Sequence, residues 1–144
     1  MNDRYLYRAK RKNWREFPKE MWWIEGYYAY FKQNDNHCIY YETDGFTLVC
    51  DIDISTLCAC TGLKDKNGKL IWENDIIEAH LDDLFPEDIS RFQVLWKDYS
   101  FKIRLEKELY DDFSDYVSEL FEVAGNIFDN PELLEWENER KRMY

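Results

Sequence analysis

Short runs of bulky β-forming residues, separated by turn signals, constrain this chain more than any other feature of its sequence. The runs fall at residues 5–9, 22–31, 38–41, 46–51, 70–72, 75–79, 92–96, 99–105 and 122–128. Two of the gaps hold Asp44-Gly45 and Asn67-Gly68, pairs that are typical of tight hairpin turns. Strands this short, spaced roughly 8 to 12 residues apart, favour a barrel or sandwich over alternating strands and helices. The sequence therefore predicts a mainly β fold, and we expect a small β-barrel.

Two further local patterns refine this prediction. The run at 22–31, WWIEGYYAYF, is nearly all apolar and predicts a strand buried on much of both faces. Asn74 follows a short strand and is predicted to occupy a left-handed turn position.

The last third of the chain predicts two helices. Apolar residues recur at helical spacing from Phe113 to Phe121, and acidic residues fill the opposite side. Asn130-Pro131 has the cap and first-turn residues of a helix start, so we expect a C-terminal helix over about 131–144. Together with the strands, these helices predict β structure with a minor α component.

Length and composition predict one folded domain. The chain has 144 residues, 45% of them hydrophobic, and no Gly/Ser-rich or Pro-rich stretch that would mark a linker. It shows neither the apolar core of a signal peptide nor the roughly 18 apolar residues of a membrane span. We therefore expect a cytoplasmic protein without membrane contact.

Charge is distributed unevenly along the chain. The net charge is -11, yet residues 1–20 carry seven basic and three acidic side chains, whereas residues 82–139 carry seventeen acidic and five basic ones. An excess of acids counts against binding nucleic acid through most of the surface. The basic N-terminal segment is the exception, and its candidate contacts are Arg8, Lys10, Arg11, Lys12 and Trp14.

The residues capable of chemistry form no recognisable catalytic motif. His80 with Asp82 and Asp83 offers a metal site only on paper, since no third ligand stands at a fixed spacing. Cys38, Cys50, Cys58 and Cys60 with His37 offer a zinc site, but the usual C-x2-4-C knuckles are absent, and buried thiols are favoured. No nucleophile elbow, phosphate-binding glycine loop or zinc-protease helix is present. We predict no catalytic residue, no metal and no cofactor; an enzyme with a loop site that the sequence does not reveal is left as an alternative.

Several blocks resemble one known family. Residues 61–77, TGLKDKNGKLIWENDII, resemble the YopX-family signature TGLKDKNGKEIYEGDIV. Residues 7–10 resemble the family's opening FRAWD, residues 93–96 its VVW strand, and residues 121–134, FEVAGNIFDNPELL, its closing EVIGNIYENPELL. The chain is thus identified as a member of the YopX family. The resemblance implies an SH3-like β-barrel with a helical end and an origin in bacteriophages or related mobile elements, and it implies no particular activity.

The signature itself is interpreted as a set of folding instructions. Asn67-Gly68 and Glu73-Asn74 are turns, and Gly62 and Gly125 fit places where the backbone bends or packs closely. A ligand surface around the 64–69 hairpin is the alternative.

A protein partner is the leading functional hypothesis. A small domain has difficulty burying all of its large rings, so an exposed aromatic patch that includes Trp22, Trp23 and Tyr27 is one candidate contact surface. The acidic side chains of Asp111, Asp112, Asp115 and Glu119 are the other, and they suggest a domain that mimics nucleic acid and inhibits a host protein. Nucleic-acid binding through the N-terminal segment is the alternative, and self-association stays open.

Overall fold

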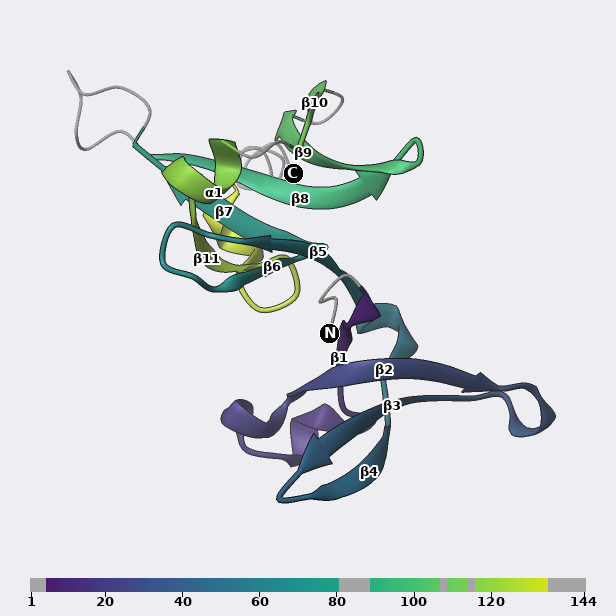
Figure 1. The fold of residues 1–144 in the computed structure, drawn as a ribbon. Helices are drawn as coiled ribbons and strands as arrows, with labels where there is room; N and C mark the ends of the chain where they lie inside the picture. Colours follow the sequence, from purple (N-terminus) through teal and green to yellow (C-terminus); the bar gives the residue numbers. More distant parts are fainter. Residues whose placement is uncertain (1–4, 81–88, 107–108, 114–115, 135–144) are drawn as a thin grey trace, which may run out of the picture. The chain divides into compact units, whose positions relative to one another are not determined.

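The computed structural model describes residues 5–80, 89–106, 109–113 and 116–134 (Figure 1). By its internal contacts the chain divides into two compact units, residues 1–60 (unit 1) and residues 61–144 (unit 2). Strand β5, Cys58–Lys64, runs through the point of division. Because this division does not measure independent folding, the single domain stays a prediction.

Unit 1 is an antiparallel sheet built mainly from sequential hairpins. Its strands are β1 (Tyr7–Lys10), β2 (Trp23–Phe31), β3 (Asn36–Thr43), β4 (Phe46–Asp51) and the start of β5, in the spatial order β4-β3-β2-β1-β5. Short 3-10 turns lie at Trp14–Glu16, Lys19–Met21, Lys32–Asn34 and Ile54–Thr56. The apolar core is small and consists of Ala9, Ile24, Ile39 and Ile52, with partly buried tyrosines packed against it.

Unit 2 holds a five-stranded antiparallel sheet in the order β10-β9-β8-β7-β11. Its strands are β7 (Asp75–Ala79), β8 (Ser90–Lys97), β9 (Ser100–Glu106), β10 (Leu109–Asp112) and β11 (Glu122–Asn126). The end of β5 pairs with β6 (Leu70–Trp72), and α1 (Tyr116–Leu120) precedes β11. Seven buried apolar residues form the core: Ile71, Ile77, Ala79, Val94, Ile103, Val117 and Phe121. One helix side chain, Val117, thus packs with side chains of three sheet strands.

The predicted turns are confirmed by backbone geometry. Asp44 and Gly45 both have positive φ, 49° and 80°, as a hairpin turn of the primed type requires. Asn74 has φ 70°, in the left-handed region. The runs at 92–96 and 99–105 fall in β8 and β9, which pair as a hairpin whose turn is formed by Asp98 and Tyr99, at φ 53° and 69°.

The mainly β fold is confirmed, but no closed barrel is found in the part of the chain that is described. β4 lies at one end of the unit 1 strand order, and β10 and β11 lie at the two ends of the five-stranded sheet. Next to the end of β4, an isolated bridge joins Arg11 to Ile52, and Lys12 N donates to Asp51 O at 3.0 Å. One bridge at the end of a strand is not a ladder, so the described strands do not close into a barrel.

The predicted helices are shorter than expected. The acidic helix starts only at Tyr116, because Asp111 and Asp112 lie in β10, opposite Ile103 and Lys102 of β9. There Asp112 pairs with Lys102 at 2.8 Å, which favours the strand. Of the C-terminal helix, the described residues contain one 3-10 turn, Pro131–Leu133, and the remainder of the prediction lies outside them. No helix in the described ranges has the length and apolar character needed to span a membrane.

The prediction for β2 was wrong in one respect. Its burial alternates near the start of the strand, with Ile24 buried and Glu25 exposed, and its far end is open at Tyr30 and Phe31. Bulky aromatic residues occupy both faces, but only one face meets the core.

Candidate functional site

The signature hairpin between β5 and β6 is held together by one buried carboxylate. Asp65 is only 6% exposed. Its Oδ1 accepts hydrogen bonds from the backbone N–H groups of Asn67 and Lys69, and its Oδ2 accepts one from Val123 of β11, each at 2.9 Å. Burial raises the pKa of this carboxyl group, but the three backbone donors outweigh burial, and the net pKa is lowered.

Other polar residues of the signature and the closing block also satisfy backbone groups. Asp75 Oδ2 accepts from Trp72 N at 2.8 Å, and Thr61 donates its hydroxyl to Ile71 O at 2.7 Å. Asn126 Oδ1 accepts from the N–H groups of Phe128 and Asp129. These contacts support the interpretation of both blocks as folding instructions.

The basic N-terminal segment folds around its own aromatic rings. The Lys10 side chain is only 2% exposed, and its Nζ lies 3.8 Å from the ring centre of Trp14, 4.6 Å from Trp22 and 5.5 Å from Trp23. Lys10 therefore occupies an aromatic cage made by three indoles. Trp14 and Trp22 themselves contact edge to face at 4.6 Å.

Further hydrogen bonds fix this tryptophan cage. Trp14 Nε1 donates to Asp53 Oδ2 at 3.2 Å, and Trp22 Nε1 donates to Phe17 O at 2.9 Å. The hydrogen bond from the Ser55 hydroxyl lowers the pKa of Asp53, burial opposes this, and the bond from Trp14 lowers the pKa further, so the net pKa is lowered. Trp22 and Trp23, predicted as partner contacts, are half-buried parts of this cage.

The nucleic-acid candidates do not form one exposed basic surface. Arg8 is buried, with its guanidinium 4.9 Å from the ring centre of Trp23, and Lys10 lies in the cage. Arg11 donates to Met21 O at 2.8 Å and to Cys50 Sγ at 3.2 Å. Only Lys12 of the predicted cations is exposed, and Trp14 is half-buried. Part of the positive charge of this segment is therefore buried and does not contribute to an exposed basic surface.

The acidic candidates are dispersed. Asp111 and Asp112 are exposed on β10, but Lys102 pairs with Asp112, and Lys97 lies 4.7 Å from the ring centre of Tyr110 on the same strand. Glu119 is exposed on α1, and Asp115 lies outside the described residues. Asp112 therefore has a cationic partner, and Asp111 and Glu119 lie on two different elements.

The histidines and cysteines form no metal site within the described ranges, where no three His, Cys, Asp or Glu side chains gather to hold an ion. All four cysteines are thiols; three are buried and Cys50 is half-buried. Burial raises the pKa of Cys38, which disfavours the thiolate that zinc requires. His37 Nδ1 instead forms a hydrogen bond with the Tyr28 hydroxyl at 2.6 Å, and its ring stacks on Tyr30 with the ring centres 4.6 Å apart. His80 is exposed, and Asp82 and Asp83 lie outside the described residues.

One face of the β2–β3–β4 hairpins gathers exposed aromatic, apolar and acidic side chains. Strand register places Tyr27 opposite Tyr40, Tyr40 opposite Val49, and Glu42 opposite Thr47. Alternation puts Ile24, Tyr28, Ile39, Tyr41 and Cys50 toward the unit 1 core. We call the opposite side the outer face, and define it by Glu25, Tyr27, Tyr40, Glu42, Thr47 and Val49. Tyr27 is 38% exposed and Val49 55%.

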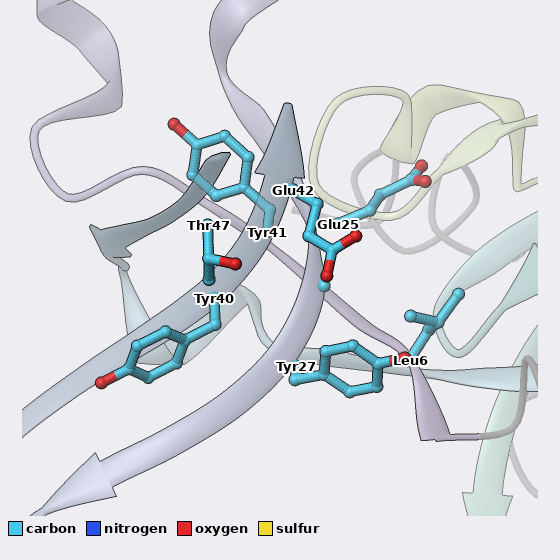
Figure 2. Close-up of a pocket in the computed structure, with 8 residues that line it drawn as sticks. Leu6, Glu25, Tyr27, Tyr40, Tyr41, Glu42 and Thr47 are labelled. Carbon is cyan, nitrogen blue, oxygen red and sulfur yellow. The ribbon is translucent and has the colours of Figure 1, made fainter. Parts of the chain in front are cut away.

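A pocket of about 190 Å³ lies on this outer face (Figure 2). It is bordered by the outer-face residues Glu25, Tyr27, Tyr40, Glu42 and Thr47, together with Leu6, Gly26 and Tyr41, the last of which also packs against the unit 1 core. All of these residues belong to unit 1. The pocket offers a ligand aromatic rings and two carboxylates.

Comparison with known proteins places the chain in a family. The model for the family described as YopX protein matches residues 7–135. The chain belongs to the YopX family. The resemblance read from the signature is thereby confirmed. The comparison with curated proteins gives no match.

A solved structure shares this YopX-family fold. The chain is similar to the crystal structure of protein EF1440 from Enterococcus faecalis, with a TM-score of 0.51 and 21% sequence identity. The similarity covers 90% of this chain and 96% of that one. At this identity the likeness concerns the fold alone.

Sequence reasoning found Tyr27 but missed the rest of the outer face of this YopX-family chain. The signal was present, because the Asp44-Gly45 turn fixes the pairing of Thr43 with Phe46 and hence of Glu42 with Thr47. Following that register by two more residues brings Tyr40 opposite Val49. Their exposure, however, depends on which face meets the core, and that required the structure.

Proposed function

We propose that this chain is a non-enzymatic accessory domain of a phage or related mobile element that binds another protein through the outer face. The single observation that carries the proposal is the row Tyr27–Tyr40–Val49 beside a pocket on an open sheet face. Tyrosine is enriched at the centres of protein contacts, where it supplies apolar area together with a hydroxyl. The origin in a mobile element rests on the family resemblance.

Charge mimicry receives less support than contact through the outer face. The described acids Asp111 and Asp112 have cationic neighbours, whereas a mimic of nucleic acid needs a continuous acidic surface. Nucleic-acid binding loses Arg8 and Lys10, whose side chains are buried. Both ideas are therefore outcomes of the test.

The test is affinity purification from the host with three forms of the protein, at low salt. We expect one recurrent protein with the wild type and with Tyr99→Ser, and its loss with Tyr27→Ser combined with Val49→Ser. Tyr99 is the matched control, since it is 94% exposed and belongs to unit 2. Light scattering on each form reports self-association.

Three results would contradict the proposal. One is equal recovery of the protein by the double variant. Another is loss of the protein only after replacement of Asp111 and Asp112, which would favour charge mimicry. The third is recovery of salt-sensitive nucleic acid in place of a protein.

A further inference from the structure

We propose that the pocket on the outer face receives an arginine side chain of the partner protein. This deepens the proposed function and rests on it. The occupant follows from the chemistry of the lining: two carboxylates, tyrosine rings and no lysine or arginine among the described residues that form the pocket.

The carboxylates supply the charge complementarity. Glu42 on β3 and Glu25 on β2 are both exposed, and neither makes an ion pair with a described residue. Glu25 stands opposite Arg8 in the β1–β2 register, so part of its field falls on a cation of the chain itself. Glu42 stands opposite the neutral Thr47. We therefore assign the main contact with the guanidinium to Glu42.

The rings supply the second element. Tyr27 and Tyr40 stand opposite one another in the β2–β3 register, and Leu6 lies beside Tyr27 in the pocket (Figure 2). A guanidinium is planar, stacks on aromatic faces and binds carboxylates through two parallel hydrogen bonds, whereas an ammonium does neither as well. These properties favour arginine over lysine.

The tryptophan cage is a comparable site in which the cation belongs to the chain itself. In the tryptophan cage, Lys10 fills the space between three rings and is only 2% exposed. In the pocket, aromatic and acidic side chains are assembled likewise, but Tyr27 remains 38% exposed. The pocket thus resembles a cation-binding site whose cation would come from another molecule.

The probe is the synthetic peptide acetyl-Gly-Arg-Gly-amide, titrated into the full-length ¹⁵N-labelled protein at low ionic strength. We expect saturable amide shifts centred on residues 25–27, 40–42 and 47. The same peptide with glutamine in place of arginine should give no saturable shift, and the lysine peptide should bind more weakly. Added salt should weaken the binding of the arginine peptide, because the pocket is open to solvent.

Three variants sharpen the titration. Glu42→Gln keeps the size of the side chain. It should lower the affinity for the arginine peptide about tenfold, as expected when a charge-assisted bidentate contact is lost. Glu25→Gln should weaken it less, because Arg8 lies opposite. Glu20→Gln, an equal change of charge at an exposed position outside the pocket lining, should leave binding unchanged.

The inference is overturned if the glutamine peptide shifts the same amides equally, if Glu42→Gln binds as the wild type does, or if the lysine peptide binds at least as tightly. These failures are distinguishable from failure of the proposed function. A partner lost with the Tyr27 and Val49 double variant, but with no arginine-peptide binding, would leave the protein contact standing and remove the arginine.

Discussion

Units 1 and 2 are both antiparallel sheets, yet they are stabilised in different ways. Unit 2 has an apolar core of seven buried residues, and its turns are held by buried polar side chains such as Asp65 and Asn126. Unit 1 has an apolar core of four buried residues and stacks cations on indole rings outside it. The family signature, residues 61–77, and the closing block, residues 121–134, both fall in unit 2. The family match itself begins at residue 7 and so includes unit 1. We infer that the signature and the closing block mainly stabilise unit 2, and we place the proposed contact surface in unit 1.

The largest expected effect is in unit 2, at Asp65. Asp65→Ala leaves three backbone N–H groups without their acceptor, and should lower the free energy of unfolding by roughly 3 kcal/mol. Urea unfolding followed by circular dichroism measures this loss. Glu119→Ala, at an exposed position on α1, is the control and should change stability by less than about 0.5 kcal/mol. A loss at Asp65 no larger than that of the control would show that the signature is not a folding device.

The next effect is in unit 1, where β2 and β3 approach closely. A methyl group at Gly26 would collide with the carbonyl oxygen of Tyr40 and with the Ile39 side chain, so Gly26→Ala should cost about 2.5 kcal/mol. Gly45→Ala is the matched control in the same hairpins. It meets nothing nearby, and only its φ of 80° opposes it, at about 1 kcal/mol. Equal losses from the two glycines in urea unfolding would argue against close packing at Gly26.

The third prediction concerns the contribution of the buried Lys10 side chain to the stability of unit 1. Lys10→Ala should cost about 2 kcal/mol, because a desolvated cation–aromatic contact and a packed aliphatic stem are lost together. Lys10→Met, which keeps most of the stem, should cost less. Lys12→Ala is the exposed neighbour and the control. Unfolding monitored by tryptophan fluorescence gives all three values, and a Lys10→Ala protein as stable as Lys12→Ala would refute the cage as a stabilising element.

The smallest effect is a loss of folding stability at acidic pH. Asp65 and Asp53 have folded-state pKa values below the ordinary 3.8, so their contribution is complete above that value and is lost as pH falls through the lower folded pKa. Unfolding free energy measured at a series of pH values should therefore decline in the window below about pH 4. Asp65→Asn should remove the contribution of Asp65, in unit 2, to this decline in unfolding free energy. Asp53→Asn should remove the contribution of Asp53, in unit 1. A slope unchanged in both variants would assign the acid dependence to other groups.

The sequence predicted local structure well where short-range rules decide it. Asp44-Gly45 and Asn74 adopt the predicted turn geometry because a few residues determine each turn. The predicted acidic helix is present but short, and Asp111 and Asp112 before it lie in β10, where pairing with β9 prevails over local periodicity. The expected barrel is not closed within the described ranges, and the sequence could not predict this, because closure depends on the pairing of distant strand edges that no local pattern describes.

The candidate site was less accessible to prediction. Arg8 and Lys10 count as surface charge in any reading of composition, and only the positions of Trp14, Trp22 and Trp23 show Lys10 inside. Tyr27 was predicted as a contact, but Glu42 stands among thirty acidic residues and could not be singled out. Its neighbours across the strands, rather than its own identity, give it a role.

The enclosure of Lys10 also makes its amine an internal reporter. A reagent that acylates amines reaches exposed lysines such as Lys12 at once, but reaches Lys10 only when the three indoles separate. The rate at which mass spectrometry detects acylation of Lys10 therefore measures how often unit 1 opens.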